Sequence, residues 1–364
     1  MSFCPFDNVT DTAESDVSSC CLDFATSTNG FYRASLAIHV VSGVLGVFLS
    51  VYYLCKYSSR HFLPRNTKVF LWMTLAAIIT HSTTLTSMQA LHLMRSFQAV
   101  ESDPCSVQST VSSCTVFRHS NSITLLILGF NQYFVYVDRL LDNMCSWYKS
   151  AQNLILSVLL ISEVFLAVII SLFAYRNAIP TEPLLSCLNV PRSSTIDVTI
   201  ATAVFLPINC LCIIMSILLF RRHRRNVTES RFDVLRHFHA KLNKDALCFL
   251  RSTTITMSVL IVLYPILITT VRLTFYYTPR ILNKTLGNLA HIANWYCVIV
   301  PVVMIHAARK VRSERRRKID SILQKQVHGE EGANTYFNLL NSQWQKSHES
   351  RSGQHEKSSV EEIV

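Results

Sequence analysis

The chain alternates between long apolar runs and short polar connections. Seven runs are roughly 20 residues or longer, the length that a helix needs to cross a bilayer, at about 32–55, 69–92, 114–137, 151–175, 196–220, 247–276 and 285–308. Polar residues interrupt the third run at Asn121, Asn131 and Gln132 and the seventh at His291 and Asn294, so six spans is the alternative. The pattern predicts an all-α membrane protein, a bundle of seven transmembrane helices.

Composition favours a membrane protein over a nucleic-acid-binding one. Of the 364 residues, 50% are hydrophobic and 16% are charged, which is too apolar for most soluble domains. A formal net charge of +11 would suit a nucleic-acid partner. However, Lys and Arg are clustered between the apolar runs, as the loops of membrane proteins require. We therefore expect a membrane-embedded protein with no nucleic-acid partner.

The basic residues also predict the side of the membrane that each loop faces. Lys and Arg gather in segments 56–68, 221–246 and 309–318, which share one side if there are seven spans, whereas residues 1–31 contain acids and no Lys or Arg. Because basic loops stay in the cytosol, the N-terminus is predicted outside and the C-terminus in the cytosol. No cleavable signal peptide is visible, so the first span is expected to direct insertion.

This orientation divides the chain into four parts. Residues 1–31 form an extracellular segment and 32–308 the bundle. Residues 309–325 are expected to form a basic helix along the inner leaflet, and 326–364 a disordered cytosolic tail. The sequon at Asn8 is then a glycosylation site. An even number of cysteines faces the oxidising side, which suggests disulfides: Cys4, Cys20, Cys21, Cys105, Cys114 and Cys187. Cys105 is expected to pair with Cys20 or Cys21.

A charged pair at the end of the third run carries a family resemblance. A helix from Cys114 to Asp138 is ~36 Å long, one full membrane crossing, and Arg139 follows at once. Three features together resemble G-protein-coupled receptors. They are Cys114 at the start of the third span, Cys187 after the fourth span, and the Asp-Arg pair at the end of the third span. The segment "DPCSVQSTVSSCTVFR" and the linker "RFDVLRHFHAKLNKDALCFLR" resemble the nematode serpentine receptors of class alpha and class alpha/beta.

The resemblance implies a chemosensory receptor in the plasma membrane of sensory neurons. It would bind a small extracellular molecule and signal through a heterotrimeric G protein, with a disulfide between Cys114 and Cys187. It also implies that Arg139 is held in the resting state by Asp138 beside it and by Asp245 at the start of the sixth span. Two alternatives stay open: Asp245 only caps that helix, and the Asp138–Arg139 pair only marks the membrane edge.

Polar residues in the outer half of spans three and seven are candidates for ligand binding. They are candidates because cavities between helices are the usual place for small ligands. The set consists of Asn121, Thr124, His291 and Asn294. Arg118 and His119 lie in the same region. The alternative for each residue is a structural hydrogen bond between helices, and it is favoured for Glu163 in span four and for His39 and His81. Asn121 stands where amine receptors carry an acid, which disfavours a biogenic amine.

No motif indicates an enzyme. A nucleophile elbow, a phosphate loop and a metal-ligand helix are all missing from the sequence, so no catalytic residue, metal or cofactor is expected. The alternative function is a transporter or a ligand-gated channel subunit. Transporters often contain internal repeats, which the sequence does not show, and insect-type odorant channels place the N-terminus inside, opposite to the charge pattern here.

Overall fold

The structure is a computed structural model in which nearly every described residue is helical. It describes residues 16–57, 63–100, 102–145, 147–229, 234–274, 277–325 and 332–345. The chain forms two compact units, Met1–Ala308 and Arg309–Val364. The first unit contains the bundle.

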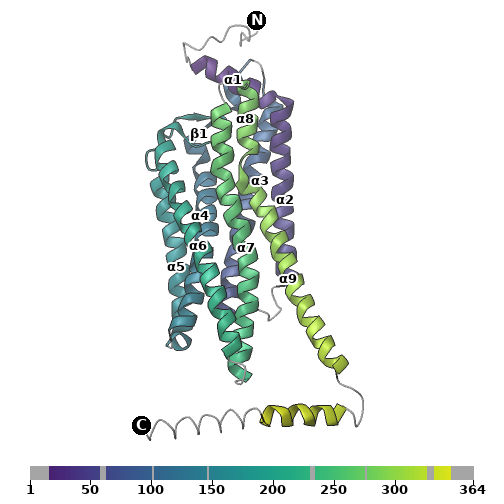
Figure 1. Cartoon of the computed structure of the whole chain (residues 1–364). Coiled ribbons are helices and arrows are strands. Elements are labelled where there is room, and N and C mark those ends of the chain that lie inside the picture. The colour runs from purple at the N-terminus through teal and green to yellow at the C-terminus, as the bar shows by residue number, and fades with distance from the viewer. Residues whose placement is uncertain are drawn as a thin grey trace. The chain divides into compact units, whose positions relative to one another are not determined.

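Seven helices in the described part of the chain are long, and α2 to α7 lie side by side in the bundle (Figure 1). They are α2 (Gly30–Tyr57), α3 (Arg65–Gln98), α4 (Val111–Met144), α5 (Tyr148–Ala174), α6 (Thr195–Glu229), α7 (Val234–Leu273) and α9 (Ile292–Lys325). The first unit also contains two shorter helices, α1 (Asp16–Thr28) and α8 (Arg280–Leu289), and two 3-10 turns, η1 (Pro104–Val107) and η2 (Arg192–Ser194).

Five stretches of the described residues are long and apolar enough to cross a membrane. They are α2, α3, α5, Ala246–Val271 within α7, and Arg280–Arg317 across α8 and α9. The long helix α4 is not among them, because polar residues such as Arg118, Asn121 and Asn131 lower its hydropathy. Two of these, Arg118 and Asn131, are buried within the bundle at 5% and 3% exposure, so α4 places polar groups in the interior.

Two helix boundaries differ from those predicted. The seventh span, predicted as one helix over 285–308, is interrupted at Ala290 and His291, between α8 and α9. The apolar run does not reveal this break, because a change of backbone direction leaves the composition unaltered. In addition, the predicted extracellular segment 1–31 contains helix α1. Its sequon at Asn8 lies outside the described residues.

One end of the bundle is closed by disulfides, and we call it the disulfide end. Cys20 of α1 is bonded to Cys105 of η1, and Cys114 of α4 to Cys187. The second bond is the one that the family resemblance implied, and the first is one of the two pairings, with Cys20 or with Cys21, that the sequence left open for Cys105. The segment before Cys187 forms a short antiparallel ladder in which β2 (Pro183–Leu184) pairs with β1 (Ser109–Thr110), with Ser109 opposite Leu184. The connection between α5 and α6 is thus held against the start of α4.

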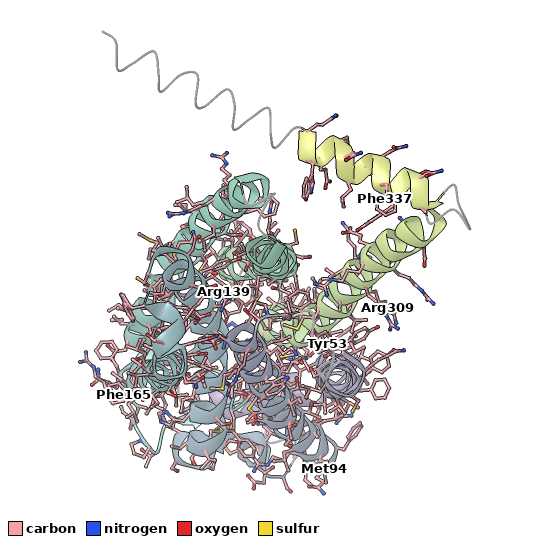
Figure 2. All side chains as sticks on the ribbon, turned by 90° about the horizontal axis from the view of Figure 1, so that it is seen from below. Tyr53, Met94, Arg139, Phe165, Arg309 and Phe337 are labelled. Atoms are coloured by element: carbon pink, nitrogen blue, oxygen red, sulfur yellow. A yellow bond between two sulfur atoms is a disulfide. The ribbon has the colours of Figure 1, made fainter. Side chains whose placement is uncertain are left out.

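The bundle has polar groups inside and apolar groups outside, as membrane bundles do. Phe165 of α5 points away from the bundle and is 62% exposed, whereas Arg139 lies among the helices and is 2% exposed (Figure 2). Small residues allow close helix packing. A Cβ atom at Gly43 of α2 would lie 2.0 Å from Oγ1 of Thr86 on α3, so a larger residue there would force the Thr86 side chain to shift.

In the second unit, the predicted basic segment 309–325 is helical, but it continues α9 and does not form a separate helix. Its position on the inner leaflet stays a prediction. Residues 332–345 are also helical, within the tail for which composition predicted disorder. The rest of that tail lies outside the described residues.

Candidate functional site

The interior near the disulfide end contains a group of polar side chains that we call the central polar cluster. Its members are His39 of α2, His81 and Gln89 of α3, Asn121 and Thr124 of α4, and His291 and Asn294 beside and on α9. His39, His81, Gln89 and Asn294 are each no more than 1% exposed. Four helices of the bundle therefore contribute polar groups to one buried region.

The hydrogen bonds of His81 determine which of its ring nitrogens carries the proton. Its Nδ1 lies 3.0 Å from Oγ1 of Thr124, and its ring also interacts with the main chain of Asn121. The Thr124 hydroxyl donates to the main-chain carbonyl of Ser120 at 2.8 Å. Since that proton is in use, Nδ1 of His81 is the donor to Thr124, and its Nε2 is left as an acceptor.

His39 has the opposite tautomer. Nε2 of Gln89 lies 3.4 Å from Nδ1 of His39, and because an amide nitrogen only donates, this Nδ1 accepts. Nε2 of His39 then carries the proton. Asn294 donates through Nδ2 to Oγ of Ser42 at 2.6 Å and to the main-chain oxygen of His39 at 3.2 Å, which leaves its Oδ1 as an acceptor.

His291 connects the two sides of the cluster. It stands at the break between α8 and α9, its ring is 6.0 Å from that of Tyr264 on α7, and it lies near His39 and His81. The interruption that the sequence did not predict is therefore the feature that brings this imidazole into the bundle.

Among the described residues, five buried polar atoms of the cluster have no hydrogen-bond partner. They are Nε2 of His39, Nε2 of His81, Oε1 of Gln89, Oδ1 of Asn121 and Oδ1 of Asn294. An unsatisfied buried polar atom costs ~1–3 kcal/mol, so a group of them indicates a region that takes up water or a polar ligand. By the tautomers above, four of the five are acceptors.

The four residues predicted to bind ligand are all members of this cluster. Thr124 contacts His81 of α3, and Asn294 contacts the main chain of His39 of α2. Both the structural and the ligand interpretations retain a basis, because Thr124 is hydrogen-bonded whereas Asn121 has an unpartnered oxygen. Gln89 was missed, since its position in a polar-rich part of its span gave no signal.

A second polar group joins three helices in the middle of the bundle. Asn131 of α4 accepts a hydrogen bond from Thr74 of α3 at 2.9 Å and donates to Glu163 of α5 at 3.4 Å. Glu163 is fully buried. The contact agrees with the favoured interpretation of this acid as a partner of a neighbouring helix.

The opposite end of the bundle, which we call the Asp138 end, contains a buried hydrogen-bond network. Oδ1 of Asp138 accepts from Nδ2 of Asn66 at 2.8 Å and from the hydroxyl of Tyr148 at 2.6 Å, and its Oδ2 accepts from Nε of Arg139 at 3.0 Å. Gln152 donates to Oδ1 of Asn66 at 3.0 Å. Asn66 begins α3 and Tyr148 begins α5, so Asp138 ties the ends of three helices together.

The environment of Arg139 corrects one sequence interpretation. Asp138 is 0% and Arg139 is 2% exposed, so the pair does not snorkel at the membrane edge. Arg139 also reaches Asp142, with NH1 3.4 Å from Oδ2. The side chain of Asp245 lies outside the described residues. Since α7 begins at Val234, eleven residues earlier, Asp245 does not cap the start of this helix.

Comparison with known proteins places this architecture in a family. The family model described as serpentine type 7TM GPCR chemoreceptor Sra matches residues 13–340. The chain belongs to this family. Its members are seven-transmembrane receptors, so the protein is a multi-pass membrane protein of a receptor family, and the family predicted from the sequence is confirmed.

Individual serpentine receptors match over most of their length. The chain is 36% identical to serpentine receptor class beta-18 of Caenorhabditis elegans over 330 residues, 90% of each chain. It is 23% identical to class beta-16, covering 88% of this chain and 94% of the relative, and 22% identical to class alpha-10, covering 82% and 89%, both also from Caenorhabditis elegans. Class beta thus appears among the relatives beside the predicted class alpha.

Proposed function

We propose that the protein is a chemosensory receptor of the plasma membrane of sensory neurons. It binds a small molecule from outside the cell at the central polar cluster and signals to a heterotrimeric G protein from the Asp138 end. The observation that carries the ligand site is the group of unpartnered polar atoms buried at the meeting point of α2, α3, α4 and α9. The ligand residues are Asn121, Thr124, His291 and Asn294, together with His39 and His81.

The disulfide end is the extracellular end in this proposal. Disulfides form and persist in oxidising compartments, and the bonds Cys20–Cys105 and Cys114–Cys187 both lie at this end. The basic segments 56–68, 221–246 and 309–318 then face the cytosol, as the positive-inside rule requires. Glycosylation at Asn8 follows from the same orientation.

The Asp138 network is the resting form of the coupling site. In this form Asp138 holds the guanidinium of Arg139 at 3.0 Å inside the bundle, away from any cytosolic protein. A G protein would bind a second state in which Arg139 is released, and a ligand favours that state if it binds it more tightly. Asp245 is the further acid proposed to hold the resting state, from α7.

Nucleotide exchange on a purified G protein tests the proposal. The full chain in lipid nanodiscs is mixed with heterotrimeric G proteins, and GTP uptake is measured. Because the two states are in equilibrium, a fraction of the chain occupies the second state without ligand. We therefore expect the chain to accelerate uptake, and Arg139→Gln to abolish the acceleration. Arg176→Gln is the matched control, because Arg176 is a 54% exposed arginine at the disulfide end. No acceleration with any G-protein class, or full acceleration by Arg139→Gln, would contradict the proposal.

A further inference from the structure

Arg118 is a buried cation at the disulfide end. It lies on α4 one turn beyond Cys114, and only 5% of it is exposed. Its guanidinium lies 5.4 Å from the centre of the Tyr175 ring, at the end of α5. The disulfide from Cys114 to Cys187 holds the connection between α5 and α6 against this part of α4. Protein therefore surrounds the charge on several sides.

The described residues supply no hydrogen-bond acceptor for two of the three nitrogens of this guanidinium. These two nitrogens, Nε and NH2 of Arg118, are buried. An arginine is always charged and presents donors in a rigid fork, so an unpaired buried one is costly. The side chain of Arg118 is thus poised to bind an anion.

The nearest acid, Glu182, is occupied elsewhere. It interacts with Arg118 through its charge, but its Oε1 accepts from the main-chain nitrogen of Arg192 at 2.6 Å and its Oε2 from the hydroxyl of Ser193 at 2.8 Å. Glu182 therefore holds the loop over the bundle. Its charge partly offsets that of Arg118, but it accepts no hydrogen bond from Nε or NH2 of Arg118.

Arg118 is continuous with the central polar cluster. Arg118, Asn121 and Thr124 are three residues apart on α4, so they lie along one side of the helix over ~9 Å. On the other side, Tyr175 interacts with Tyr264, and Tyr264 contacts His291. A chain of polar and aromatic groups thus leads from the arginine to the two histidines.

We propose that Arg118 binds the carboxylate of a small organic acid, which is the chemical class of the ligand. This inference rests on the proposed receptor function and adds the chemistry of recognition. Nε and NH2 match the two oxygens of a carboxylate, and the face of Tyr175 supports the guanidinium. The rest of the acid extends along α4 toward Asn121 and Thr124, where a hydroxyl or amide hydrogen of the ligand meets the unpartnered acceptors.

Binding of matched acids and neutral analogues tests the proposal. The full chain in nanodiscs is titrated at fixed pH with three acids: hexanoate, 6-hydroxyhexanoate and benzoate. It is titrated in the same way with three neutral analogues: hexanol, hexanamide and benzamide. The midpoint of thermal unfolding gives the apparent affinity. We expect the acids to bind and their neutral partners to bind at least about tenfold more weakly, since hydrogen bonds to charged groups have this size. Sodium phosphate at equal ionic strength should leave the midpoint unchanged.

Three variants separate recognition from folding. Arg118→Gln should weaken acid binding by about tenfold or more, whereas Arg118→Lys should weaken it less. Glu182→Gln should strengthen acid binding, because it removes the offsetting negative charge while keeping an acceptor for the loop. That gain does not depend on the stability of an Arg118 variant. Arg222→Gln is the matched control, an exposed arginine of α6 away from the Glu182 loop, and should bind as the unaltered chain does.

Several results would overturn the proposal. These are binding of neutral analogues alone, binding of no compound, equal binding by Arg118→Gln, and equal binding of phosphate, which would make the site one for inorganic anions. Each leaves the G-protein exchange experiment unaffected. The receptor function can thus stand while the organic-acid inference fails.

Discussion

The two ends of the bundle use buried polar groups in opposite ways. At the Asp138 end, both carboxylate oxygens of Asp138 accept hydrogen bonds, and its donors come from α3, α4 and α5. In the central polar cluster, five buried atoms have no hydrogen-bond partner in the part of the chain that the structure describes. A satisfied network stabilises one arrangement, whereas an unsatisfied one gains stability only when something binds. This difference supports the proposed function, in which the Asp138 end stabilises the resting state and the central polar cluster binds the ligand.

Replacement of Asp138 should have the largest effect on stability. Asp138→Ala leaves the buried Arg139 without its main partner and removes the acceptor of Asn66 and Tyr148. Breaking a buried pair in this way costs ~3–5 kcal/mol. Thermal unfolding of the full chain in nanodiscs should show a large drop in midpoint. Asp103→Ala is the control, because Asp103 is exposed and its side chain caps no helix. Equal midpoints for the two variants would show that the network does not hold the helices.

Loss of the disulfide at the opposite end should cost nearly as much. Cys187→Ser frees a loop of 73 residues, and removing a native disulfide costs ~2–5 kcal/mol. Cys55→Ser is the control, since Cys55 is exposed and forms no disulfide. The unfolding midpoint and non-reducing peptide mapping together check this. If both Cys114 and Cys187 were free thiols in the unaltered chain, the bundle would not be closed by a disulfide between them.

Removal of one donor should have a moderate effect. Tyr148→Phe deletes the hydroxyl that donates to Asp138 at 2.6 Å, and a hydrogen bond to a charged group contributes ~1.5–3 kcal/mol. Tyr277→Phe, an exposed tyrosine, is the control. If the hydroxyl helps to hold the resting state, Tyr148→Phe should also raise ligand-free GTP uptake. If Tyr148→Phe changed neither the unfolding midpoint nor the ligand-free GTP uptake, Tyr148 would not contribute to the network.

Replacement of Gln89 in the cluster should change stability least. Its Oε1 has no partner and its Nε2 makes only a 3.4 Å contact with His39. Gln89→Met keeps the volume and removes an unsatisfied acceptor, so the unfolding free energy should change by about 1 kcal/mol or less. A loss as large as that of Asp138→Ala would show that the cluster is a structural network like the other end.

The sequence predicted the helices but only part of each site. Apolar runs located the spans, and a fixed spacing from Cys114 located Asp138. Of the partners of Asp138, the adjacent Arg139 was predicted but Asn66 was not, because Asn66 is 72 residues away and only the packing of α3 against α4 brings it close. In the same way, the break at His291 depends on packing that composition does not record. The sequence placed Arg118 in the candidate ligand region. Only the structure shows that its Nε and NH2 have no acceptor among the described residues.

The ligand response of a four-alanine variant tests the central claim most directly. Asn121, Thr124, His291 and Asn294 are replaced together, and calcium signals are recorded in cells that express equal surface amounts of each chain, using a compound that activates the unaltered receptor. The account predicts that the half-maximal concentration rises at least about tenfold, since several hydrogen bonds of ~0.5–1.5 kcal/mol each are lost. An unchanged response would contradict a ligand site at the central polar cluster.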